Sequence, residues 1–173
     1  MSELMVRMAE LAASQDAGDV LTALGLGSCV GVALLDGSGA VAALGHVVLP
    51  DSREATDGAA AKPAKFADTA VPTLVDEMLR NGARRGGLYA VLVGGAQMFS
   101  LGANSLDIGR RNEAGVREAL EAAGVPVRTA VTGGGVGRTI RVYVGTGMVT
   151  CKEAGGTETD VSTITSSELA EAA

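Results

Sequence analysis

The residues best suited to chemistry are one cysteine and the single histidine of the chain. Cys29 follows a glycine-containing turn at 25–27, and His46 comes 17 residues later. A thiol beside an imidazole can act as a nucleophile, because the imidazole takes the thiol proton and stabilises the thiolate. An Asp-Gly turn signal at 36–37 lies between them. In a hairpin that turns on residues 37 and 38, Cys29 and His46 would lie directly opposite, with Cβ atoms about 4.5–5.5 Å apart.

The same two residues can also be interpreted as structural rather than catalytic. A lone buried cysteine is usually an inert part of the core, and a lone histidine is more often structural than catalytic. The predicted pairing across the hairpin is what raises the catalytic hypothesis to equal standing. The second cysteine, Cys151, has no histidine or acidic partner near it in the sequence, so we expect it to be structural.

The hairpin belongs to a larger set of predicted elements. Residues 28–35 are almost continuously apolar and predict a buried strand, and 40–49 predict its return. Apolar residues at helical spacing predict helices over 69–81, capped by Asp68, and over 110–123, stopped by Gly124. The sequence also predicts strands over 88–93, 125–131, 139–144 and 148–152, an edge strand or short helix within 1–15, and an exposed, mobile loop over 51–65.

These elements predict an α+β protein. The expected architecture is a mixed, mainly antiparallel β-sheet core in a layered α/β sandwich with about two long flanking helices. With 173 residues, 47% of them hydrophobic, the chain can bury one sizeable core. We expect a single domain over 1–152. Residues 153–173 are rich in Gly, Thr, Ser and Glu and predict a disordered tail.

Charge and composition exclude several function classes. Lys and Arg total 14 and Asp and Glu total 20, giving a net charge of −6 that argues against a nucleic-acid partner and an anionic membrane surface. No apolar run reaches the roughly 18 residues of a membrane span, and residues 1–15 carry no signal-peptide core. We therefore expect a cytoplasmic protein without membrane insertion. The two widely separated cysteines fit this reducing compartment, in which thiols stay reduced.

Metal chemistry is not expected either. Two cysteines and one histidine supply at most three soft ligands, without the paired spacing that zinc sites use. The Cys-His chemistry above needs no cofactor. We therefore predict neither a metal nor a cofactor for the reaction.

Six motifs follow one another along the chain: LGLGSCV at 24–30, GHVVLPD at 45–51, FADTAV at 66–71, GGAQM at 94–98, IGRRN at 108–112 and TGGGVGR at 132–138. Together they resemble the CheD family of bacterial chemotaxis proteins. Any one of them alone would be weak. Their shared order makes the resemblance specific, and it spans about 20–152, most of the chain.

The resemblance implies a function and a site. Members of the family are chemoreceptor glutamine deamidases, which hydrolyse side-chain amides of selected glutamines in methyl-accepting chemotaxis receptors. They bind the phosphatase CheC in organisms that have it. The resemblance places the nucleophile on Cys29 and the base on His46. It also implies a layered α/β fold related to cysteine-dependent bacterial toxin deamidases.

One position departs from the family pattern. The family's third catalytic residue is a threonine six positions before the cysteine, where this chain has Ala23 and carries Thr22 one residue earlier. Neighbouring residues of a strand point to opposite faces, so Thr22 can orient His46 only if a bulge shifts the register. Backbone N–H groups at Ser28 and Cys29 are candidate donors to the oxyanion.

Two other functions stay open. Ala23 favours a catalytically weak or inactive adaptor that binds receptors or a CheC-like phosphatase. A cysteine hydrolase acting on small amides is a further alternative. The exposed loop at 51–65 counts against it, because that loop suggests an open site able to admit the surface of a helix.

Overall fold

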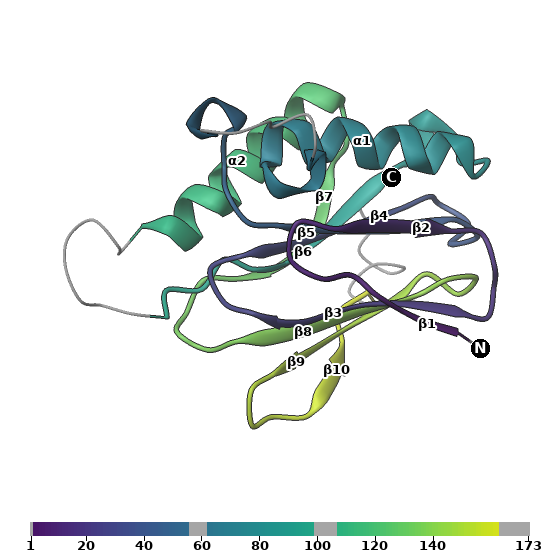
Figure 1. Cartoon of the computed structure of the whole chain (residues 1–173). Coiled ribbons are helices and arrows are strands. Elements are labelled where there is room, and N and C mark those ends of the chain that lie inside the picture. The colour runs from purple at the N-terminus through teal and green to yellow at the C-terminus, as the bar shows by residue number, and fades with distance from the viewer. Residues whose placement is uncertain (1, 56–61, 99–106, 163–173) are drawn as a thin grey trace.

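Two five-stranded sheets face each other, and two helices cover the outer face of one of them (Figure 1). This architecture comes from a computed structural model, which describes residues 2–55, 62–98 and 107–162. The three layers are therefore helices, sheet B and sheet A. The predicted α+β class, with mainly antiparallel sheets and two long helices, is confirmed.

Sheet B contains the predicted hairpin and lies under the helices. Its strands, in spatial order, are β2 (Leu11–Ser14), β5 (Ala42–Val47), β4 (Val30–Leu35), β6 (Tyr89–Gly94) and β7 (Val127–Thr132). Only β6 and β7 pair in parallel, and the chain connects them through a helix. Every residue of β4, β5 and β6 is buried, because both faces of these strands are covered.

Sheet A forms the opposite outer layer. Its spatial order is β1 (Ser2–Met5), β3 (Asp19–Leu26), β8 (Arg138–Tyr143), β9 (Met148–Glu153) and β10 (Glu158–Asp160). The predicted tail at 153–173 therefore contains a strand, since β10 pairs with β9 and Val161 N donates to Val149 O at 2.8 Å. The fold continues past the predicted boundary, and residues 163–173 lie outside the described residues.

The helices are α1 (Ala67–Arg80) and α2 (Ile108–Ala123). α1 begins two residues before the predicted start, because Asp68 does not cap it. The Asp68 carboxylate instead accepts bonds from Ser52, at 2.8 Å from N and 2.6 Å from Oγ. α2 ends as predicted at Gly124, whose φ of +74° is left-handed. Among the described residues, no helix is long and apolar enough to cross a membrane.

The predicted loop at 51–65 and the N-terminal segment both contain structure that the sequence pattern did not show. Single 3-10 turns occupy Ser52–Glu54 and Pro63–Lys65 of the loop, and 56–61 lie outside the described residues. Residues 1–15 give two strands rather than one element. β1 joins sheet A and β2 joins sheet B, so this segment crosses from one layer to the other.

Alternation along the strands separates two cores. Val30, Val32 and Leu34 of β4 pack toward the helices, whereas Ala33 and Leu35 pack between the sheets, where Cys29 also lies. On β5, Leu44 faces the layer between the sheets. The period of two then places His46 on that same face. Both predicted site residues thus belong to the layer between the sheets.

Candidate active site

The hairpin pairs Cys29 and His46 differently from the prediction. His46 lies opposite Gly31, and Val30 opposite Val47, so direct opposition of Cys29 and His46 is wrong. The connection is six residues long, 36–41, rather than a two-residue turn. Since Cys29 and Gly31 are two positions apart, the cysteine still lies on the face of His46. It occupies the diagonal position, at which neighbouring residues are about 7–8 Å apart and their Cβ atoms somewhat closer.

An aspartate accounts for the longer connection. The Asp36 main-chain oxygen accepts from Gly39 N at 3.0 Å, and its carboxylate accepts from Ser38 Oγ at 3.0 Å and from Val41 N at 3.5 Å. The main-chain bond closes a turn on Gly37 and Ser38, as predicted, and the carboxylate bonds hold the chain beyond that turn as far as Val41, before β5 begins. A carboxylate that organises a loop in this way shifts the strand register by two residues and leaves the facing pattern intact.

Main-chain bonds hold the segment that carries Cys29. The turn after β6 supplies them: Ala96 N donates to Gly27 O at 2.8 Å, and Gly95 N donates to Cys29 O at 2.9 Å. A Cβ on Gly94 would lie 2.2 Å from Cys29 O, and the φ of Gly94 is +119°. Only glycine permits this close approach. The first three residues of the GGAQM motif, 94–96, therefore fit against the backbone of the cysteine segment.

The segment 6–10, which connects β1 to β2, holds His46 in place. His46 N donates to Glu10 O and His46 O accepts from Ala9 N, both at 3.0 Å. The ring Nδ1 lies 3.2 Å from the Val6 main-chain oxygen. A carbonyl oxygen can only accept, so this contact assigns the ring proton to Nδ1 in the neutral imidazole. The lone pair is then on Nε2, which is the arrangement that a general base requires.

Burial keeps both groups neutral. His46 is 4% exposed and Cys29 is 9% exposed. Burial lowers the pKa of His46 below its ordinary value, and the Val6 carbonyl and the Glu10 carboxylate only oppose this shift. Burial raises the pKa of the Cys29 thiol, against the influence of its own backbone N–H. The resting pair is thus a thiol and an imidazole, and in the described part of the chain no hydrogen bond joins them.

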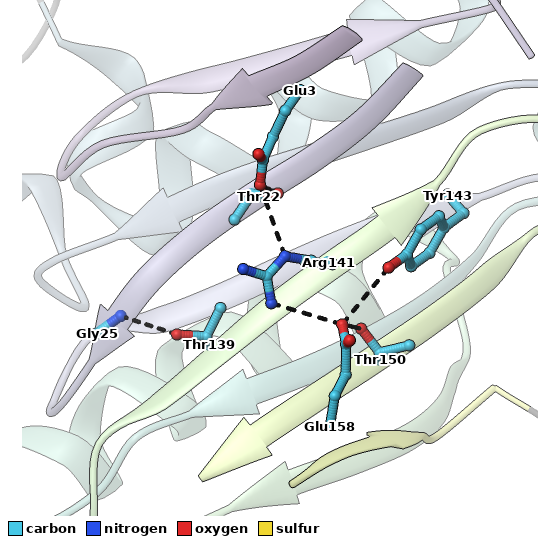
Figure 2. A network of polar contacts seen from close by, with 8 residues as sticks. All are labelled: Glu3, Thr22, Gly25, Thr139, Arg141, Tyr143, Thr150 and Glu158. Carbon is cyan, nitrogen blue, oxygen red and sulfur yellow. Dashed lines mark hydrogen bonds and ion pairs between the residues drawn. The ribbon is translucent and has the colours of Figure 1, made fainter. Parts of the chain in front are cut away.

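Thr22 and Ala23 point to opposite sides of sheet A. The Thr22 hydroxyl donates to Glu3 Oε1 at 2.9 Å, within a polar network on the outer face of the sheet (Figure 2). Ala23 is fully buried between the sheets. β3 does contain an irregularity, but it falls between Ala23 and Leu26 and so leaves Thr22 facing outward. The structure therefore does not bring Thr22 to His46, and the imidazole contacts the Val6 carbonyl instead.

One functional candidate was missed although its motif was noted. Asn112 of α2 is fully buried, and its Nδ2 donates to Ser28 O and to Val48 O, both at 2.9 Å. A polar side chain at a helix position spaced four residues from the buried Val116 is a signal that sequence reasoning could have used. No comparable signal exists for Val6, because its contribution comes from the main chain.

The remaining candidates lie elsewhere. Cys151 is buried in the layer between the sheets and, as a free cysteine, has its pKa raised by burial. A groove of about 550 Å³ runs between α1 and α2 and includes neither Cys29 nor His46. Within 2–55, 62–98 and 107–162, no three His, Cys, Asp or Glu side chains gather as metal ligands would.

Known proteins resemble this chain over most of its length. The family model described as CheD chemotactic sensory transduction matches residues 48–153. A protein of Caldanaerobacter subterraneus subsp. tengcongensis named "Probable chemoreceptor glutamine deamidase CheD" is 42% identical over 154 residues, which cover 88% of this chain and 93% of that protein. A protein of the same name from Clostridium botulinum (strain Hall) is 40% identical over 155 residues, covering 88% and 94%.

These matches differ in what they cover. The family model begins after His46, but a match over 88% of a 173-residue chain must include the stretch from Cys29 to His46. Among solved structures, a Neisseria meningitidis protein of the DUF152 family has a TM-score of 0.47 and 11% identity, over 77% of this chain and 64% of that one. The family model, which spans more than half of the chain, and the relatives at 40–42% identity show that this chain belongs to the CheD family.

Proposed function

We propose that this protein hydrolyses the side-chain amides of specific glutamines in methyl-accepting chemotaxis receptors, with Cys29 as nucleophile and His46 as general base. One observation carries the assignment of roles. His46 lies on the same sheet face as Cys29, and the Val6 carbonyl 3.2 Å from Nδ1 leaves Nε2 as the ring's proton acceptor. The curated relatives of this chain are named chemoreceptor glutamine deamidases, which supports the substrate.

The reaction follows from a neutral pair. Cys29 Sγ bonds to the amide carbon of the glutamine side chain while its proton passes to Nε2 of His46. The C–N bond then breaks, and the nitrogen takes this proton and leaves as ammonia. His46 next deprotonates a water that adds to the thioester carbon. The C–S bond breaks, the sulfur regains a proton, and a glutamate side chain is released.

The Val6 carbonyl supports activity despite Ala23. A third group in such sites holds the imidazole in one tautomer and one orientation. A carbonyl that accepts from Nδ1 does both, so a threonine hydroxyl at position 23 is not required for this role. The adaptor alternative depends on the missing threonine, and the contact of His46 with Val6 supplies what that threonine would do.

Partners and location belong to the same proposal. The receptor is the partner that the reaction requires, and a CheC-like phosphatase is a second candidate. We place the reaction in the cytoplasm, where the free thiols of Cys29 and Cys151 stay reduced. Binding of a purified CheC-like protein, measured by calorimetry with and without a receptor fragment, tests the second partner.

Intact mass of a receptor cytoplasmic fragment tests the function. Each deamidation replaces NH₂ by OH and adds about one dalton. We expect the wild type to shift the mass, Cys29→Ala to reduce the rate by more than about 10³-fold, and the matched Cys151→Ala to leave it within about twofold. A wild type that binds the fragment without changing its mass supports the adaptor. Faster hydrolysis of free glutamine than of the receptor supports the small-amide hydrolase.

A further inference from the structure

Asn112 ties the segment of Cys29 to the strand of His46. Backbone pairing between β4 and β5 ends at Val30 and Val47. Immediately beyond this last pair, the two amide hydrogens of Asn112 reach one carbonyl on each side, Ser28 O and Val48 O, both at 2.9 Å. The side chain thus replaces the next backbone connection between the two strands, and it does so from the helix layer.

The position of Asn112 is fixed by close packing of α2. One turn earlier, a Cβ on Gly109 would lie 2.4 Å from Ala96 O and 2.6 Å from Gly95 O, so glycine alone lets the helix approach this turn. The same turn donates its N–H groups to Gly27 O and Cys29 O. α2, the turn at 94–96 and the cysteine segment therefore form one hydrogen-bonded unit, and Asn112 is held at a constant place relative to Cys29.

Peptide geometry then sets the direction of the Cys29 N–H. The described chain has no cis peptide bond, and in a trans peptide the C=O of one residue and the N–H of the next point in opposite directions. Asn112 holds the Ser28 C=O from the side of α2. The Cys29 N–H must point away from Asn112.

From this arrangement we infer that Asn112 is a positioning residue, which holds the Ser28 carbonyl so that the Cys29 N–H donates to the oxygen that becomes negative when Cys29 attacks the glutamine amide. The inference rests on the proposed function and adds the group that stabilises its tetrahedral intermediate. Asn112 Oδ1 is buried without a hydrogen-bond partner among the described residues. Such an orphaned acceptor is unfavourable, so the amide is better explained by the two carbonyls it holds than by packing.

The test compares two reactions of the same sulfur. Iodoacetamide alkylates Cys29 by attack at a CH₂ carbon and develops no oxyanion. The second reagent is a receptor peptide in which an aldehyde replaces the target carboxamide. The Cys29 sulfur adds to the aldehyde carbon, and the thiol proton ends on the carbonyl oxygen. We expect Asn112→Leu to weaken aldehyde binding and kcat by about 10²-fold, with KM within a few-fold and the alkylation rate of Cys29 within about twofold.

Two controls separate positioning from stability. Val116→Ala removes buried volume one turn further along α2 without touching Ser28, and we expect both reactions to be unchanged. If Asn112→Leu does not fold, NMR of the wild type decides: aldehyde addition should shift the Cys29 N–H proton strongly downfield, as a donor to the new oxygen. An unshifted proton overturns the inference.

The remaining outcomes are distinguishable. A parallel loss of alkylation and aldehyde binding in Asn112→Leu means that Asn112 is only structural, and no loss of either also overturns the inference. In both cases the deamidase function stands if the wild type is active. A wild type that neither deamidates the receptor nor binds the aldehyde overturns the proposed function, and this inference with it.

Discussion

The two faces of β3 are organised in opposite ways. On the outer face, side chains position one another: Arg141 contacts Glu3 at 3.6 Å and Glu158 at 3.5 Å, and Thr22 and Thr150 add hydroxyl bonds to these carboxylates (Figure 2). On the inner face, Cys29 and His46 are held mainly by main-chain groups. The two carboxylates of this network are exposed, so the ion pairs can rearrange with little loss. A buried site held by main-chain groups depends on the path of the chain.

Of the substitutions that test this contrast, Gly94→Ala should cause the largest loss of stability and of deamidation. The added Cβ would lie 2.2 Å from Cys29 O, at a φ of +119° that alanine rarely adopts. We expect a loss of more than about 2 kcal/mol of unfolding free energy in urea and a marked loss of deamidation. Gly86→Ala is the matched control, since a Cβ there meets nothing within 4 Å. Equal stability of the two variants would contradict positioning by the main chain.

Separate substitutions of Thr22 and Ala23 should have the next largest effects. Thr22→Val removes one bond to Glu3, so we expect a loss of about 1 kcal/mol and a rate of deamidation within twofold. Ala23→Thr places a hydroxyl in the fully buried layer between the sheets and should cost about 1–3 kcal/mol without raising the rate. Denaturant unfolding and the mass assay measure both. A crippled Thr22→Val enzyme would show that Thr22, not Val6, orients His46.

Replacing Glu10 by Gln should change the pH dependence of deamidation modestly. His46 acts as a base only when neutral, so activity falls as the pH drops through its pKa, which burial holds below about 6.5. The Glu10 carboxylate raises that pKa. Glu10→Gln should therefore move the acid limb of kcat/KM to lower pH, while its amide oxygen can still accept from Arg7 N. A limb that moves to higher pH, or stays in place, would argue against His46 as the base.

The smallest effect is expected on the outer face. A hydrogen bond from Thr150, helped by Arg141, lowers the pKa of Glu158. This carboxylate therefore adds stability above its unfolded pKa, and the contribution is lost as the pH falls through the lower folded value. Because the group is largely exposed, Glu158→Gln should cost less than about 1 kcal/mol at pH 7, with unchanged deamidation. Thermal unfolding at pH 7 and pH 3 checks this, since the two proteins should converge in acid.

The path of the chain explains which predictions needed the structure. The apolar runs and turn signals were sufficient for the α+β class and for the left-handed stop of α2 at Gly124. The period of two was sufficient to place Cys29 and His46 on one face. The register was not predictable, because the Asp36 side chain organises the connection. β10 was missed because its polar residues lie on an edge strand that β9 holds by main-chain bonds.

By itself, the sequence determined the family, the departure at Ala23 and the two residues proposed as nucleophile and base, because each of these is a side-chain identity at a given spacing. Only the tertiary structure decided what holds those side chains. The Val6 carbonyl at Nδ1 and the 94–96 turn at Cys29 O are main-chain contacts, so the sequence does not show which groups they join. Asn112 is a side chain, but its partners, Ser28 O and Val48 O, are 84 and 64 residues away. Such contacts exist only once the sheet and α2 have packed.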